Sequence, residues 1–156
     1  MTALVFTCVS AASSLASAEV VAPPGWKSAP ELVAAAALAM RSDSVKLVAS
    51  HGYSAPALGC YAVWLQLAGP AMRIDRAAQQ LVASIKSAGI AVRDVIAPTT
   101  SPRGVVALQF AQAPYQGVVR AALTETGELE AVACAWNDRE PTLCEASCAK
   151  FMAAVQ

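Results

Sequence analysis

The chain has 156 residues, the length of a single domain, and its 11 basic residues balance its 11 acidic residues. Zero net charge provides no electrostatic basis for binding nucleic acid or an anionic membrane, so neither is an expected partner. Hydrophobic residues reach 56% but aromatic residues only 6%, which predicts a core built mostly from small side chains.

The first 18 residues carry no charge, and the first charged residue is Glu19. An apolar run begins at Leu4, and Ala16-Ser17-Ala18 has the small-x-small pattern of a cleavage site. We therefore predict a signal peptide at 1–18, one domain at 19–156, and export to the periplasm or the extracellular space. The alternative to a signal peptide is that residues 1–18 are a disordered Ala/Ser-rich tail. Lipidation at Cys8 stays open, although the preceding Thr7 is larger than usual there.

The predicted domain begins with an extended, turn-rich stretch at 23–26. Ser28, with Glu31 three residues later, forms a capping-box pattern that predicts a helix over 29–41. Residues 45–53 and 58–68 are predicted strands. In the second strand, period-two alternation places four residues together on one face: Cys60, Ala62, Trp64 and Gln66.

Asp75 is the predicted N-cap of a second helix, whose apolar stripe ends before a C-terminal cap at Gly89. No segment after the leader reaches the roughly 18 uncharged apolar residues of a transmembrane helix. Further strands are predicted at 90–97, 104–110, 116–124 and 128–136, the last two joined by a hairpin at Thr126-Gly127. Thr142 and Glu145 form a second capping-box pattern, which opens a final helix that runs to about Val155.

This order of elements, with short connections, predicts an α+β fold in which two or three helices pack on a disulfide-stapled antiparallel sheet. Pro24-Gly25-Trp26, the paired strands, the strand meander and a last helix around Phe151 resemble the PsbP/DcrB-like superfamily of small exported α+β proteins. The resemblance covers most of 23–155, but the alanine-rich helix at 29–41 and the cysteines depart from it. It implies a non-catalytic accessory or ligand-binding protein and transfers no functional residue.

Four cysteines behind an export-like leader predict two disulfides: Cys60, Cys134, Cys144 and Cys148. Cys144 and Cys148 lie one helical turn apart and face the sheet, so each is expected to bond to a strand rather than to the other. We favour Cys134–Cys144 with Cys60–Cys148, because the shorter loop then connects the nearer element ends. The swapped pairing remains open.

The alternative role of the cysteines is chemical. Cys144 and Cys148, completed by Cys60, Cys134 or His51, could hold copper(I) or zinc. Thiol–disulfide exchange is a further possibility, but the Cys-x-x-Cys motif is absent. His51 is the only histidine and so the only ordinary base near neutral pH. We interpret it as an exposed loop residue rather than as the base of a hydrolase with Ser54.

The densest polar run is Asn137-Asp138-Arg139-Glu140, which is either a surface recognition loop or a solvent-exposed turn. Glu125, Glu128 and Glu130 surround a hairpin tip and are expected to be solvated. The three tryptophans are expected to be core anchors because aromatic residues are scarce: Trp26, Trp64 and Trp136.

The sequence thus predicts a small exported binding or accessory protein without catalytic activity or cofactor, whose partner is a protein or a small molecule. The alternative is a periplasmic metal-binding or thiol-redox protein that uses Cys144 and Cys148.

Overall fold

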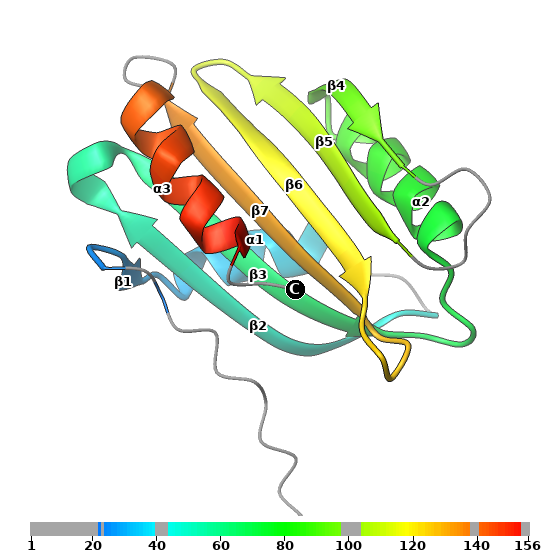
Figure 1. The fold of residues 1–156 in the computed structure, drawn as a ribbon. Helices are drawn as coiled ribbons and strands as arrows, with labels where there is room; N and C mark the ends of the chain where they lie inside the picture. The colour runs from blue at the N-terminus through cyan, green and yellow to red at the C-terminus, as the bar shows by residue number, and fades with distance from the viewer. Residues whose placement is uncertain (1–21, 23, 40–43, 98–103, 138–140, 154–156) are drawn as a thin grey trace, which may run out of the picture.

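The computed structural model describes residue 22 and residues 24–39, 44–97, 104–137 and 141–153. Seven strands form one antiparallel sheet in the order β1-β2-β3-β7-β6-β5-β4 (Figure 1). The strands are β1 Lys27–Ser28, β2 Lys46–Ala55, β3 Cys60–Ala68, β4 Ala91–Ile96, β5 Val105–Gln112, β6 Tyr115–Leu123 and β7 Leu129–Asn137. The helices are α1 Glu31–Ala39, α2 Ile74–Ser87 and α3 Pro141–Ala153, with a 3-10 turn η1 at Pro56–Leu58.

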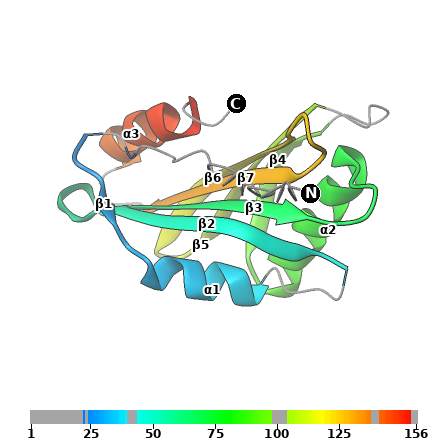
Figure 2. The ribbon, with the colours of Figure 1, turned by 90° about the horizontal axis from the view of Figure 1, so that it is seen from below.

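The helices lie on both faces of the sheet. Figure 2 shows α3 on one face and α1 on the other, and α2 packs on the α1 side against β4 and β5. The predicted antiparallel sheet with three helices is therefore confirmed. The balance of an α+β fold is only partly right, because one seven-stranded sheet dominates and the molecule is closer to a mostly-β protein.

Two apolar clusters fill the space between the helices and the sheet. The cluster beneath α3 holds the four disulfide cysteines, all three tryptophans and Phe151. The cluster on the opposite face is built from smaller side chains around Ile74 and Ala78 of α2. The tryptophans are 8%, 1% and 4% exposed, which confirms them as core anchors.

The predicted helix starts need two corrections. Ser28 is not a cap but a strand residue opposite Tyr53, because β1 pairs with the end of β2 before α1 begins at Glu31. Asp75 lies inside the first turn of α2, and the residue before that helix is Arg73. The predicted end at Gly89 is confirmed by its left-handed φ of 77° and by the bond from its N–H to the Lys86 carbonyl.

The two edges of the sheet are irregular or short. β1 has only two residues. The pairing of β4 with β5 shifts register between Arg93 and Ile96, and Asp94 adopts a φ of 47° there. Within the described segments, no helix combines the length and the apolar character needed to cross a membrane. The predicted signal peptide and Cys8 lie outside the described residues.

Candidate functional site

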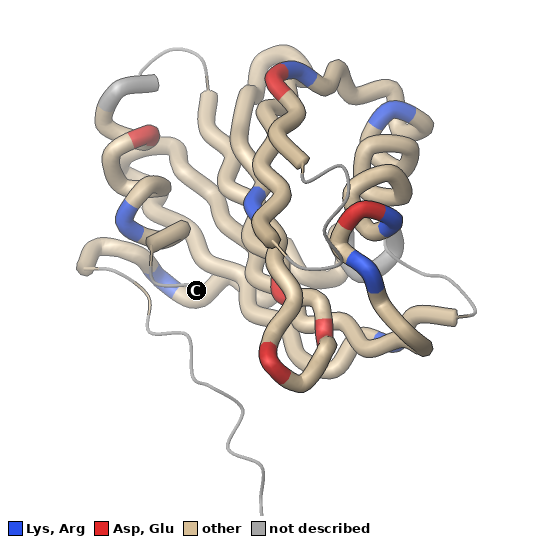
Figure 3. The backbone as a smooth tube through the Cα atoms, turned by 45° about the vertical axis from the view of Figure 1, so that its right-hand side comes forward, with Lys and Arg blue, Asp and Glu red and all other residues tan. Residues whose placement is uncertain are grey.

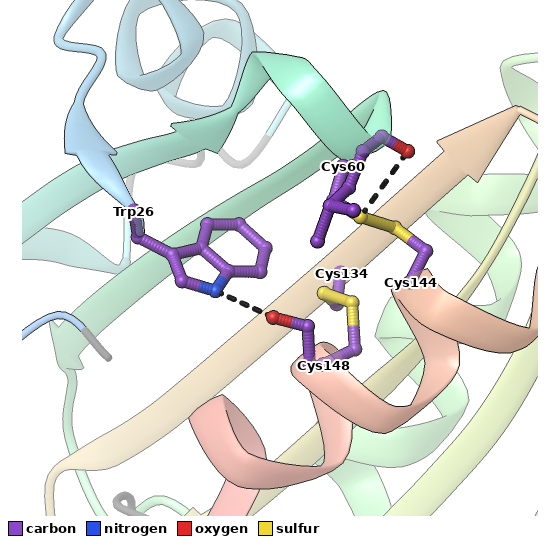
Figure 4. The surroundings of a disulfide bond; sticks show 7 residues. Trp26, Cys60, Cys134, Cys144 and Cys148 are labelled. Atoms are coloured by element: carbon purple, nitrogen blue, oxygen red, sulfur yellow. Dashed lines mark hydrogen bonds between the residues drawn. A yellow bond between two sulfur atoms is a disulfide. The ribbon is translucent and has the colours of Figure 1, made fainter. Parts of the chain in front are cut away.

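Two disulfides attach α3 to the centre of the sheet, which confirms the predicted bonding of the helix cysteines to strands. Cys60 on β3 is bonded to Cys144, and Cys134 on β7 is bonded to Cys148 (Figure 4). All four residues are at most 1% exposed. The pairing that we favoured from loop length is wrong, and the swapped pairing is the observed one.

The reason lies in the strand register. Cys60 is opposite Trp136, next to the end of β7, whereas Cys134 is two residues farther back along β7, opposite Ala62. Because α3 runs back along β7 from that end (Figure 1), its first turn meets Cys60 and its next turn meets Cys134. Position along the strand, rather than loop length, therefore decides the pairing.

Aromatic contacts hold the side of α3 that faces β1 and β2. Trp26 Nε1 donates a hydrogen bond to Ser147 Oγ at 2.9 Å (Figure 4). Phe151 packs between the rings of Trp26 and Tyr53, with centroid separations of 5.6 and 5.2 Å. Together with the disulfides, these contacts make α3 a fixed wall above the sheet.

The other side of α3 borders a cavity of about 330 Å³ over β4, β5 and β6, which we call the α3 groove. In Figure 1, α3 crosses β3 and β7, and β6 and β5 lie beside it. The polar side chains among the lining residues are Arg93, Gln109, Gln116 and Glu145, and Trp136 and Met152 add apolar surface. The volume is near the lower end of the range of about 300–1,000 Å³ for small-molecule sites.

Strand register explains why these polar residues share one face. Arg93 is opposite Gln109, Gln109 is opposite Val118, and Val118 is opposite Cys134. Side chains at directly opposed positions point to the same face of a sheet. The floor of the groove is therefore continuous with the strand face that carries the disulfides.

Trp136 forms the inner end of the floor and is 4% exposed. Within the described part of the chain, its Nε1 is the one buried side-chain nitrogen or oxygen without a hydrogen-bond partner. A buried donor left unpaired costs about 1–3 kcal/mol. The groove is thus bordered by a residue that carries unused hydrogen-bonding capacity.

A second polar cluster lies on the same face, beyond α3. Trp64 Nε1 donates to Glu130 Oε1 at 2.6 Å, and Gln66 donates to Glu128. His51 stacks on Trp64 with a centroid separation of 5.3 Å. The interpretation of His51 as a loop residue is wrong, because it lies within β2 opposite Trp64. The expectation that Glu128 and Glu130 are simply solvated is wrong too, since both are half-buried and hydrogen-bonded.

The predicted recognition run at 137–140 lies mostly outside the described residues, so it stays a prediction. Asn137 ends β7, and Asp138, Arg139 and Glu140 lie outside the described residues. Cys144 and Cys148 belong to two different disulfides, while His51 lies against Trp64. Across the segments that are described, no three His, Cys, Asp or Glu residues form a group that could hold a metal ion.

Sequence reasoning missed the α3 groove, although one signal for it was present. Arg93, Gln109 and Gln116 are polar residues on the strand face that also carries the cysteines, and only the cross-strand register reveals this. Glu145 was noted only as part of a capping box. In Figure 3, Lys and Arg positions lie among Asp and Glu positions along the described chain.

Comparison with known proteins found no family model and no curated protein that matches this sequence. The resemblance to the PsbP/DcrB-like superfamily therefore stays a prediction.

Proposed function

We propose that this protein is a small, exported, non-catalytic binding or accessory protein whose ligand site is the α3 groove. The observation that carries the proposal is the convergence of four polar side chains on one cavity: Arg93, Gln109, Gln116 and Glu145. A concave site with apolar lining and a few placed polar groups is the usual form of a small-molecule site. Such a site binds most tightly when it is preorganised. Here two disulfides hold α3, which forms one side of the groove, in place.

Export is supported by the disulfides and by the leader. Disulfide bonds persist in the periplasm and outside the cell and are rare in a reducing cytosol. The uncharged leader at 1–18 has the pattern of a signal peptide. We propose the periplasm or the extracellular space as the compartment in which the groove is used.

A binding role suits the groove better than catalysis. The described residues that line it include no histidine, the side chain that most often serves as a general acid or base. His51, the ordinary candidate for that task, lies on β2 against Trp64 and is not among the lining residues. The alternative metal or thiol-redox role is not favoured by any contact of the described residues, because exchange needs an accessible thiolate and these sulfur atoms are enclosed.

The test uses two variants of the same exposed face of α3. Ala149 lines the groove, while Ala146 is exposed on the same helix and does not. Oxidised wild-type protein, Ala149→Trp and Ala146→Trp would be screened by thermal shift against amino acids, peptides, sugars, organic acids and lipids. A ligand of the groove raises the melting temperature of the wild type and of Ala146→Trp, but not of Ala149→Trp. Stabilising ligands that Ala149→Trp still binds, or no stabilising ligand in any class, would reject the proposal.

A further inference from the structure

The α3 groove contains one positive and one negative side chain that do not neutralise each other. Arg93 enters from β4 and Glu145 from α3, so they border the cavity from two different elements. Among the described residues the only ion pair is Arg73 with Asp75, so Arg93 and Glu145 are not within ion-pair distance of each other. Both are exposed, and each is available to a group of opposite charge.

The Arg93 end is suited to a carboxylate. A guanidinium presents a planar set of donors that matches the two oxygens of a carboxylate. Gln109 is directly opposite Arg93 on β5, and its amide can donate a further hydrogen bond. No hydrogen bond or ion pair with another described residue occupies Arg93. The Arg93 end of the groove therefore offers hydrogen-bond donors that no other described residue uses.

The Glu145 end is suited to an ammonium group. An ionised carboxylate only accepts hydrogen bonds, and an ammonium group only donates them. Apolar side chains line the same cavity: Val118, Trp136 and Met152. A ligand that matched all three parts would carry opposite charges at its two ends and an apolar part between or beside them.

We infer that the α3 groove binds a small zwitterion of the amino-acid or short-peptide class, with its carboxylate on Arg93 and Gln109 and its ammonium on Glu145. This inference rests on the proposed function and specifies its ligand. The volume of about 330 Å³ favours a free amino acid or a dipeptide over a longer chain.

The experiment measures affinity by calorimetry for three forms of the same ligands: common amino acids and dipeptides with free ends, their N-acetyl forms and their C-terminal amides. The wild type should bind at least one free-ended ligand, leucyl-leucine being the first choice. Its N-acetyl and amide forms should bind at least about tenfold more weakly, as expected when a charge-assisted hydrogen bond is lost.

Variants then assign each ligand end to its residue. Arg93→Gln should bind the free acid and the amide equally, while still discriminating against the N-acetyl form. Glu145→Gln should bind the free amine and the N-acetyl form equally, while still discriminating against the amide. Two control variants remove one positive and one negative charge outside the groove: Arg76→Gln on α2 and Glu125→Gln at the β6–β7 turn. Both should still prefer the free acid to the amide and the free amine to the N-acetyl form.

Four results would overturn the inference. Equal binding of free and blocked ligands by the wild type would show that the end charges are not recognised. Discrimination that survives in both Arg93→Gln and Glu145→Gln would place recognition elsewhere. If no amino acid or peptide binds but another compound class stabilises the protein in a manner lost in Ala149→Trp, the zwitterion is wrong and the groove proposal stands. If no class binds, both fail.

Discussion

Trp64 and Trp136 face the same side of adjacent strands but differ in their hydrogen bonding. Trp64 Nε1 donates to Glu130, whereas Trp136 Nε1 lacks a partner among the described residues. Replacing either with Phe removes similar apolar surface, yet only Trp64→Phe breaks a hydrogen bond to a charged group, worth about 1.5–3 kcal/mol. We expect Trp64→Phe to lower the free energy of unfolding by about that much more than Trp136→Phe, measured by urea denaturation.

The double variant Trp64→Phe/Glu130→Ala provides the control for that comparison. Because the two residues form one interaction, their combined loss should be smaller than the sum of the single losses. Strict additivity, or equal costs for Trp64→Phe and Trp136→Phe, would show that the bond to Glu130 contributes nothing.

Asp75 gives a prediction about pH. The hydrogen bond from Arg73 lowers the pKa of the Asp75 carboxyl below its ordinary value. A carboxyl whose pKa is lower in the folded state stabilises the fold above its unfolded-state pKa, and this contribution is lost as the pH falls through the folded-state pKa. Asp75→Asn should therefore lower the melting temperature slightly at neutral pH, because the pair is exposed, and the difference should vanish in strong acid. A difference that persists there would point to a cause other than ionisation.

At the scale of elements, Gly52 fixes the attachment of α1 to the sheet. The Ala29 N–H donates to the Gly52 carbonyl at 2.7 Å, and a Cβ on Gly52 would overlap the Ala29 carbonyl oxygen. We expect Gly52→Ala to cost about 1–3 kcal/mol, the usual range for overpacking. Chemical denaturation measures this cost, and Gly52→Ser should be at least as damaging. An unchanged midpoint would mean that α1 is not held closely against β2.

The two disulfides close loops of very different length. Cys60 and Cys144 are 84 residues apart, and Cys134 and Cys148 are 14 apart. In the chain-entropy account the longer loop is worth about 4.5 kcal/mol and the shorter about 3 kcal/mol. Replacing Cys60 and Cys144 by Ala should therefore destabilise the protein more than replacing Cys134 and Cys148, as measured by urea denaturation.

Connectivity can be checked on the same samples. Cleavage at Arg139 and Glu145 separates the cysteine-containing segments, and mass spectrometry without reductant should find Cys60 linked to Cys144 and Cys134 linked to Cys148. The reverse linkage would contradict the connectivity given by strand register. A smaller stability loss for the long-loop variant would contradict the chain-entropy account.

The elements differ in how much of them the sequence could predict. The end of α2 was predictable because Gly89 supplies a left-handed cap, a local property of the chain. β1 was not, because its two residues become a strand only by pairing with Tyr53 and Ser54. The α3 groove depends in the same way on which residues become neighbours across strands, and those pairings are not local.

At the scale of the whole molecule, small side chains make the disulfides important. Together they contribute about 7.5 kcal/mol in the chain-entropy account, compared with a usual net stability of about 5–15 kcal/mol. We expect the reduced protein to unfold at 37 °C or below, followed by circular dichroism. A folded reduced protein with an unchanged melting temperature would contradict this.

The rate at which the disulfides are reduced should also depend on the stability of the folded protein. Because the four cysteines are at most 1% exposed, a reductant must wait for the protein to open. The rate should become independent of reductant concentration at high concentration, and it should rise in Gly52→Ala if α1 stabilises the molecule against opening.

The fold class was predicted less completely than the elements. Counting predicted helices and strands suggested an α+β fold, and the number of helices was right. One antiparallel sheet was predicted, but neither the strand order within it nor the pairing of β1 with β2, and the resulting seven-stranded sheet makes the molecule closer to a mostly-β protein. The position of His51 was missed for the same reason, since its stacking on Trp64 requires β2 to lie beside β3.

The irregular edges of the sheet affect how copies of this protein meet at high concentration. An exposed, regular edge strand offers unpaired backbone groups on which another chain can add a strand, a common start of aggregation. β1 pairs with only Tyr53 and Ser54, so most of that edge belongs to β2. At the opposite edge, the left-handed Asp94 interrupts β4 where Val95 and Ile96 are exposed. The irregularity at Asp94 therefore interrupts the addition of another strand along the β4 edge, next to two exposed apolar side chains.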